Sequence, residues 1–186
     1  MSVQLIRHRF TVGEYHEMAR AGVLTEDDRV ELIEGEIVDM TPIGLRHAAA
    51  VNVLTRGLAT GCGTRAIVQI QGPIPIGLRS EPQPDVLVLR PRDDFYREIA
   101  PGPEDVLLLV EVADTSLPYD RTVKIPLYAG AGVPEVWLVD LVRHRVELHR
   151  DPGPDGYRAV ETRKRGERLT PAAFPDLVLG VDDLLG

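Results

Sequence analysis

The sequence predicts an α/β fold in which a mixed central β-sheet is flanked by helices and preceded by an N-terminal helix and hairpin. Two apolar runs rich in β-branched residues, 85–89 and 106–113, are typical of strands buried on both faces, and residues 135–140 are predicted as a further strand. Residues 117–131 have helical spacing. Strand, helix and strand in this succession predict a right-handed parallel crossover. A length of 186 residues fits one core, so we expect residues 1–186 to form a single domain.

The N-terminal elements are predicted by a helix cap and a turn. Thr11-Val-Gly-Glu14 has the spacing of a capping box, which opens a short helix that ends near Ala21. Apolar runs at 30–33 and 36–40 flank Glu34-Gly35, and this arrangement predicts a tight β-hairpin.

Five further elements follow from apolar spacing and from the glycines and prolines between them. They are a helix at 45–60 ended by Gly61 and Gly63, strands at 66–71 and 74–78, and outer strands at 145–149 and 157–161 joined through 151–156.

The composition is that of an ordinary globular protein, with 44% hydrophobic and 27% charged residues. The longest apolar run, 106–110, is far too short to cross a bilayer, and the N-terminus lacks the features of a signal peptide. A single cysteine, Cys62, excludes an internal disulfide and a cysteine-based zinc site. We therefore expect a cytoplasmic protein without a membrane partner.

The net charge of −8 argues against a protein that coats nucleic acid by charge alone. The charge is uneven, because residues 141–170 carry eight basic and five acidic side chains, a net charge of +3. A solvated surface strand is the simpler interpretation of this segment, and a weak binding surface is the alternative.

Two carboxylates stand where burial is expected. Alternation places Glu111 on the same strand face as Leu109 and Ala113, and a lone buried carboxylate needs a cation or hydrogen-bond donors. Asp85 stands at the head of the 85–89 run. If the two strands are neighbours, both carboxylates can converge on one Mg²⁺, which favours such ligands together with waters and substrate phosphate. The alternatives are a capping or arginine-paired glutamate and an aspartate that only begins a strand.

Lys124 is the third member of this group. Only two of the 21 basic residues are lysines, Lys124 and Lys164, so a lysine here stands out. Its compact ammonium can orient a water or stabilise charge on a phosphate. The alternative is a surface ion pair with Asp120, four residues earlier on the same helix.

A longer pattern surrounds these residues. It consists of Pro84-Asp85, Glu111-Val-Ala-Asp-Thr-Ser116, Asp120, Lys124, Tyr128, Gly132-Val-Pro-Glu-Val-Trp-Leu-Val-Asp140 and, upstream, Arg29-Val-Glu-Leu-Ile-Glu-Gly-Glu-Ile-Val-Asp-Met40 and His47. This pattern resembles the Uma-two family of restriction endonuclease-like proteins in the PD-(D/E)XK nuclease superfamily. The resemblance covers about residues 9–185.

The resemblance implies a restriction-endonuclease-like fold and the metal-dependent hydrolysis of nucleic-acid phosphodiester bonds, with DNA as the expected substrate. The superfamily pattern has a lysine two residues after the glutamate, where this chain has Ala113, so the resemblance implies that the lysine has moved to the following helix. The expected catalytic residues are Asp85, Glu111, Lys124 and Glu31; the expected ligands of Mg²⁺ or Mn²⁺ are Asp85, Glu111, Glu31 and the backbone carbonyl of Val112.

Other polar and aromatic residues are weighed against structural roles. For Glu31, the alternative to a site role is a charged residue on a half-exposed strand. Gln69 and Gln71 are further polar candidates for the site, and they lie on one side of their strand. Structural roles are expected for the rest: a hydrogen-bonded His47, a helix-packing Tyr128 and a Trp137 in the core or an interface.

Two other functions remain open from the sequence. A nucleic-acid-binding or assembly module with little turnover would account for Ala113 and the acidic net charge. Hydrolysis of another phosphoester would give activity on nucleotides but not on polymers. The chain has no phosphate-binding glycine loop with Lys-Ser/Thr, no Gly-X-Ser-X-Gly and no His-Glu-X-X-His. A homodimer is a further expectation, since enzymes that cut duplexes often act in pairs.

Overall fold

The computed structural model describes residues 7–25 and 27–186. Its elements, in chain order, are α1 (Val12–Arg20), β1 (Val30–Ile33), β2 (Glu36–Asp39), α2 (Leu45–Cys62), η1 (Gly63–Arg65), β3 (Ile67–Ile70), β4 (Val86–Leu89), η2 (Pro103–Asp105), β5 (Val106–Ala113), α3 (Leu117–Tyr119), η3 (Asp120–Lys124), α4 (Ile125–Gly130), β6 (Glu135–Asp140), β7 (Arg145–Gly153), β8 (Gly156–Lys164), β9 (Arg168–Leu169), β10 (Leu179–Gly180) and α5 (Val181–Leu185).

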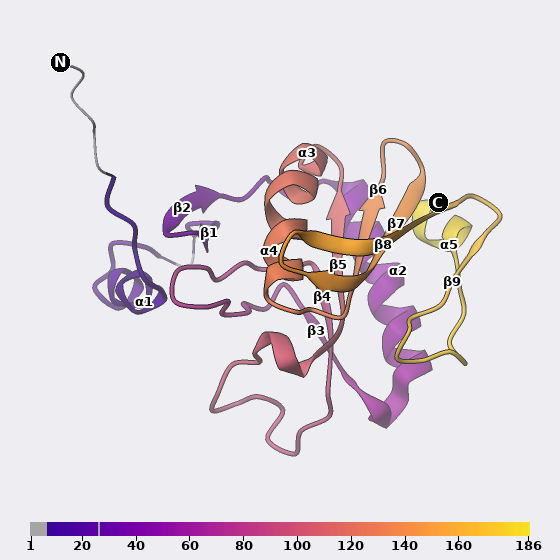
Figure 1. Cartoon of the computed structure of the whole chain (residues 1–186), viewed down its shortest axis with the longest axis horizontal. Helices are drawn as coiled ribbons and strands as arrows, with labels where there is room; N and C mark the ends of the chain where they lie inside the picture. The colour runs from indigo at the N-terminus through magenta and orange to yellow at the C-terminus, as the bar shows by residue number, and fades with distance from the viewer. Residues whose placement is uncertain (1–6, 26) are drawn as a thin grey trace.

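The central sheet has six strands in the order β3-β4-β5-β6-β7-β8. β5 and β6 run parallel, and the other neighbouring pairs are antiparallel. The predicted mixed sheet is therefore confirmed. The helical segment from α3 to α4 connects β5 to β6, as the strand–helix–strand pattern predicted (Figure 1).

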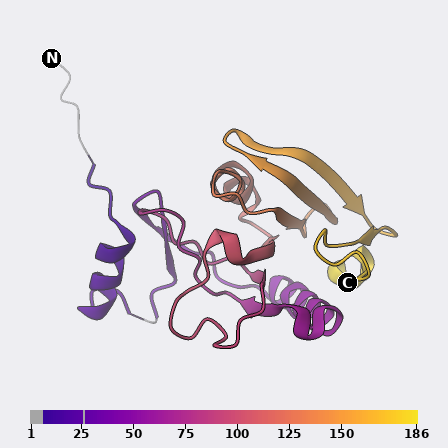
Figure 2. The same cartoon turned by 60° about the horizontal axis from the view of Figure 1, so that its bottom comes forward.

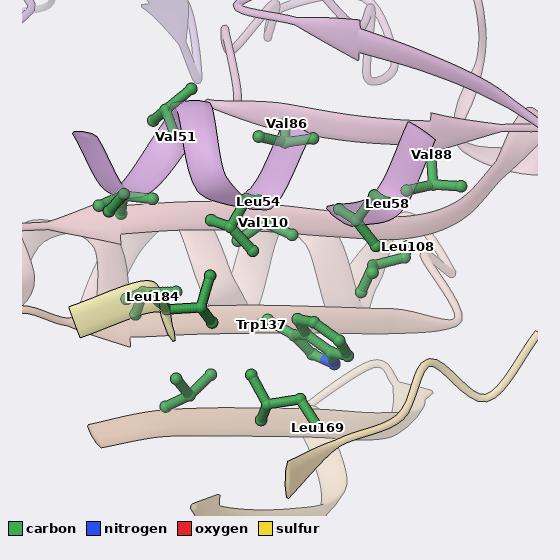
Figure 3. Close-up of a cluster of buried hydrophobic side chains, with 14 of the residues drawn as sticks. Val51, Leu54, Leu58, Val86, Val88, Leu108, Val110, Trp137, Leu169 and Leu184 are labelled. Carbon is green, nitrogen blue, oxygen red and sulfur yellow. The ribbon is translucent and has the colours of Figure 1, made fainter. Parts of the chain in front are cut away.

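Helices cover both faces of this sheet. α2 and α5 pack on one face, where Leu54 and Trp137 are fully buried (Figure 3). The segment from α3 to α4 packs on the other face. Side chains of β5 alternate between the two clusters, with Val110 in the first and Leu109 in the second. Glu111 therefore emerges on the face of Leu109, which α4 covers, as the alternation predicted.

The N-terminal helix and hairpin lie to one side of the sheet, at the opposite end of the molecule from the C-terminus (Figures 1 and 2). Thr11 caps α1 in the predicted capping box with Glu14. The hairpin turns at Glu34 and Gly35, whose φ angles are 49° and 80°. Gly35 is needed there, because a Cβ would lie 2.8 Å from the Cβ of Arg9.

The loop between β3 and β4 ties this hairpin to the sheet. Glu81 donates its backbone N–H to the carbonyl of Leu32 at 2.7 Å, and Gly35 donates to Arg79 at 2.6 Å. The strand predicted at 74–78 is wrong, since this segment forms only an isolated bridge between Ile76 and Ser80. Two prolines within the segment and beside it remove the backbone donors that a strand would need.

Boundaries of one helix and two strands also differ from the prediction. The helix begun at Leu45 continues through Gly61 to Cys62 and ends at Gly63, whose φ is 56°. β7 and β8 extend up to a two-residue turn at Pro154-Asp155, because backbone pairing continues through charged and proline positions.

Across the described parts of the chain, no helix has both the length and the apolar character needed to cross a membrane.

Candidate active site

Asp85, just before β4, and Glu111, within β5, take opposing positions on two neighbouring strands. The antiparallel register of β4 with β5 places them at adjacent positions, just beyond the last paired residues of β4. Asp85 Oδ2 accepts the backbone N–H of Val112 at 2.8 Å and lies 3.0 Å from His47 Nε2. The hydrogen bond to Asp85 raises the pKa of His47 above its ordinary value. His47 is thus hydrogen-bonded, as expected, and its partner is a site carboxylate.

Glu111 is buried, with 3% of its surface exposed. Its Oε1 accepts the Tyr128 hydroxyl at 2.6 Å and the Lys124 ammonium at 3.2 Å. Burial raises the pKa of Glu111 to about 8, because the positive charge of Lys124 only partly offsets the lost hydration of the carboxylate. The site without a cation therefore has an excess of buried acidic groups.

Lys124 joins two strands that are distant in sequence. Its Nζ lies 3.0 Å from Glu31 Oε2 and 3.2 Å from Glu111 Oε1, and the residue is 5% exposed. Burial lowers the pKa of Lys124, but the carboxylates of Glu111 and Glu31 raise it more, so the ammonium stays charged. The surface pair with Asp120 considered from the sequence is not formed.

Glu31 reaches this position from the N-terminal hairpin. It is 3% exposed and accepts the backbone N–H of Gln83 at 3.2 Å in addition to the ammonium of Lys124. The half-exposed strand position considered as its alternative is therefore wrong. The loop that ties the hairpin to the sheet supplies this burial.

The turn that carries Lys124 is a π-helix, η3, inside the predicted helix. Ile125 donates its N–H to the carbonyl of Asp120, five residues earlier, so the turn is one residue wider than in an α-helix. Both Asp120 and Lys124 are buried in this turn. Such widened turns occur frequently at functional sites.

Two residues of this segment were not predicted as site residues. Asp120 accepts the Ser116 hydroxyl at 2.6 Å, and burial raises its pKa to about 6. The hydroxyl of Tyr119 is buried and has no hydrogen-bond partner within the described chain; burial and the charge of Glu31 raise its pKa. The i, i+4 spacing to Lys124 was a usable signal for Asp120, whereas nothing in the sequence marked Tyr119.

These residues line one pocket of about 250 Å³. Its lining is rich in carboxylates: Glu31, Asp39, Asp85, Glu111, Asp114 and Asp120. The basic residues in the lining are Arg29, His47 and Lys124. A pocket with this charge is suited to a cation and, through that cation, to an anionic substrate.

The model of the Uma2 family, described as "Putative restriction endonuclease", matches residues 12–182. The chain belongs to this family. Among solved structures it is similar to the crystal structure of a putative nuclease belonging to DUF820 from Anabaena variabilis, with a TM-score of 0.73 and 19% sequence identity. The similarity covers 95% of this chain and 97% of that chain, and at this identity it shows the fold alone. No protein of curated function matches the chain.

The carboxylates of this Uma2 chain leave oxygen atoms available for a divalent cation. Donors converge on a single oxygen of each: Oδ2 of Asp85, Oε1 of Glu111 and Oε2 of Glu31. Within the described residues, no hydrogen bond reaches the second oxygen. The Val112 carbonyl points to the same strand edge as its N–H, which bonds Asp85. This donor set suits an ion that takes one or two carboxylates and several waters.

No cluster of three or more Asp, Glu, His or Cys side chains is ready to hold a metal among residues 7–25 and 27–186. The ammonium of Lys124 lies between Glu31 and Glu111 and occupies the place of a third ligand. In this arrangement of the Uma2 fold, Asp85 and Glu111 take opposing strand positions, and Glu31 is connected to Glu111 through the ammonium of Lys124.

The remaining candidates lie elsewhere or have a second role. Gln69 and Gln71 do not line the pocket. Trp137 is fully buried in the core, as predicted, and donates its indole N–H to Glu135 at 2.8 Å. Tyr128 packs its helix onto the sheet, as expected, but its hydroxyl also binds Glu111.

Proposed function

We propose that this chain is an endonuclease that hydrolyses phosphodiester bonds of nucleic acid, with DNA as its substrate and Mg²⁺ or Mn²⁺ as its cofactor. The observation that carries the proposal is the buried Lys124, bound to Glu111 and Glu31 beside Asp85 in one pocket. Membership of a family described as restriction endonucleases supports the same chemistry.

Asp85, Glu111 and the carbonyl of Val112 are the groups that would hold the ion, with Glu31 as a further acidic ligand. When bound, a divalent cation lowers the pKa of a coordinated water and offsets charge on the scissile phosphate. The charges at the site agree with this assignment, because burial leaves Glu111 with a pKa of about 8. Such a carboxylate lacks sufficient positive charge nearby.

Lys124 acts directly on the reacting groups in this proposal. An ammonium carries three protons, and two of them face Glu31 and Glu111 at 3.0 and 3.2 Å. The third is available to a water or a phosphate oxygen in the pocket. It orients the attacking water or stabilises negative charge on the phosphate as the P–O bond breaks. Glu31 holds the ammonium in place from the opposite side.

The direct test is cleavage of supercoiled plasmid, linear duplex, single-stranded DNA and RNA with Mg²⁺ or Mn²⁺. We expect cleavage by the wild type, and a loss of at least about 100-fold in Asp85→Asn and in Lys124→Met. Asp155→Asn is the matched control, since this aspartate is exposed in the turn between β7 and β8. Absence of cleavage with either metal, or equal cleavage by all four proteins, would contradict the proposal.

A second candidate is a nucleic-acid-binding or assembly module that keeps the fold with little turnover. Ala113 favours it, because this position holds the lysine in the superfamily pattern, and so does the net charge of −8. Calorimetric titration with Mn²⁺ separates the two. Binding that is lost in Asp85→Asn supports the enzyme, and no carboxylate-dependent binding supports the module.

A further inference from the structure

A residue that lines the same pocket, Tyr119, has an unpartnered hydroxyl. Buried polar side chains are almost always hydrogen-bonded, and leaving one unbonded is costly. Within the described residues, three buried polar atoms lack a partner: the Tyr119 hydroxyl, His47 Nδ1 and His149 Nε2. Two of these residues, Tyr119 and His47, line the pocket. Unsatisfied groups concentrated at one pocket indicate a ligand that satisfies them.

The position of Tyr119 identifies which part of the ligand it meets. Tyr119 lines the same pocket as Glu31, Lys124 and Asp120, and the charges of these three residues act on its hydroxyl. Tyr119 immediately precedes the π-helix that carries Asp120 and Lys124. One helical segment therefore brings both the phenol and the ammonium into the lining of the pocket.

Arg29 brings a second donor to the mouth of this pocket. Its side chain is exposed and lines the pocket, and its backbone carbonyl accepts the N–H of Met40 at 2.8 Å, which fixes the start of β1. Its charge acts on His47, which lies in the same lining. A guanidinium offers a planar fork of donors that matches two phosphate oxygens.

A polyanion needs such donors, because the lining of this pocket is dominated by carboxylates. Two of the three ammonium protons of Lys124 face Glu31 and Glu111, so this residue can offer a phosphate only one donor. We propose that the Tyr119 hydroxyl and the Arg29 guanidinium form the phosphate-binding site of the substrate, with Tyr119 at the scissile phosphate and Arg29 at a neighbouring one. This inference rests on the proposed nuclease function and adds the residues that recognise the substrate backbone. Tyr119 donates a hydrogen bond and keeps its proton throughout.

Three measurements on Tyr119→Phe and Arg29→Gln test the proposal: cleavage rate with Mn²⁺, thermal unfolding, and fluorescence anisotropy of a labelled DNA duplex with Ca²⁺, which also takes oxygen ligands, in place of Mn²⁺. For Tyr119→Phe we expect kcat to fall about 100-fold, as when one donor to a developing charge is removed. Its Tm should be unchanged or rise by up to about 3 °C, because the variant loses an unsatisfied buried group. A hydroxyl with a structural role would instead lower the Tm.

For Arg29→Gln we expect duplex affinity to fall about tenfold, with a salt dependence reduced by about one counterion. Tyr96→Phe and Arg97→Gln are the matched controls. The Tyr96 hydroxyl binds the carbonyl of Arg90 in a loop outside the pocket, and Arg97 lies in the same loop. Neither control should change kcat or affinity.

The outcomes separate this inference from the proposed function. If the wild type cleaves DNA and both pocket variants match it in kcat and affinity, the inference is overturned while the nuclease stands. If the wild type cleaves nothing but binds the duplex, weaker binding by the pocket variants supports the phosphate site without the nuclease. Three results overturn the inference: unchanged duplex affinity in Arg29→Gln, a lowered Tm in Tyr119→Phe, or a wild type that does not bind the duplex.

Discussion

Two glutamates are buried in neighbouring strands of the same sheet, and their surroundings differ. Glu135, at the start of β6, is 0% exposed. Its Oε1 accepts the indole of Trp137 at 2.8 Å and two N–H groups of Arg150 at 2.8 and 2.6 Å. Its Oε2 accepts the backbone N–H of Ala172 at 2.6 Å. Both oxygens of Glu135 therefore accept hydrogen bonds, and through Ala172 the carboxylate holds the C-terminal segment against the sheet.

Glu111, on β5, has a different arrangement of donors. Its hydrogen bonds from Lys124 and Tyr128 both reach Oε1, and the residue faces a pocket. A buried carboxylate that is saturated by protein donors stabilises one structure. One that is undersaturated and faces a cavity is suited to a ligand. The difference between the two glutamates lies in their partners, since both are almost fully buried.

The largest effect that this comparison predicts is on turnover in Glu111→Gln. We expect kcat to fall by about 10³-fold or more, roughly 4 kcal/mol, because a ligand of the ion is lost. The free energy of unfolding should change by less than about 1 kcal/mol, since burial already favours the neutral form of this side chain. Plasmid cleavage and urea denaturation measure the two quantities. A strongly destabilised Glu111→Gln would remove the distinction between the two glutamates.

Glu135→Ala should give the opposite result. The change removes the acceptor of the Trp137 indole and of Arg150 Nε, and only the carbonyl of Thr170 still accepts from Arg150. We therefore expect the free energy of unfolding to fall by about 3 kcal/mol. The kcat of the protein that remains folded should stay within about twofold of the wild type. Urea denaturation and cleavage by the folded fraction test this. Loss of turnover in the folded protein would show that the two networks are coupled.

Much of the fold could be predicted because the strongest signals are local. The apolar runs of β5 and β6 and the helical spacing between them defined the crossover, and a single charge inside an apolar strand marked Glu111. The strand prediction for 74–78 was wrong, because Pro73 and Pro75 lack the backbone N–H groups that strand pairing needs. The missing backbone donors prevent a strand at 74–78, and the pattern of apolar side chains does not show them.

The site was harder to predict because tertiary contacts complete it. The burial of Glu31 depends on the N–H of Gln83, which a loop brings from far along the chain. The π-helix that turns Asp120 and Lys124 inward has no signal in apolar spacing. Tyr119 is marked only by the absence of a partner, which requires coordinates. The sequence therefore marked the residues that stand out by type, and Glu31 through the resemblance, but it did not mark Tyr119.

The pH dependence of stability is a smaller test of the comparison. Burial raises the pKa of Glu111 from 4.5 to about 8, so between these values the folded protein holds a proton that the unfolded chain releases. Stability is therefore greatest near the lower end of this window and falls as the pH rises through it. We expect a loss of about 3 to 4 kcal/mol between about pH 5 and about pH 8 in metal-free protein. Glu111→Gln should remove most of this slope, and Mn²⁺ should reduce it in the wild type. A slope unchanged by both would place the titration elsewhere.

The smallest effect is expected from Tyr128→Phe, which removes a single donor from Glu111. Lys124 still binds the same oxygen, so Glu111 stays in place but is held less firmly. We expect about a tenfold decrease in Mn²⁺ affinity, and the free energy of unfolding should fall by about 1 kcal/mol.

Tyr157→Phe is the matched control for Tyr128→Phe, because its hydroxyl binds the carbonyl of Val133 at 2.8 Å away from the pocket. It should cost a similar amount of stability while leaving Mn²⁺ affinity unchanged. Calorimetric titration and urea denaturation of both variants give the four values needed. Equal Mn²⁺ affinities would mean that the Tyr128 hydroxyl only packs the helix. Lower affinity in Tyr128→Phe alone would show that the donors around Glu111 serve its ligand, whereas those around Glu135 serve the fold.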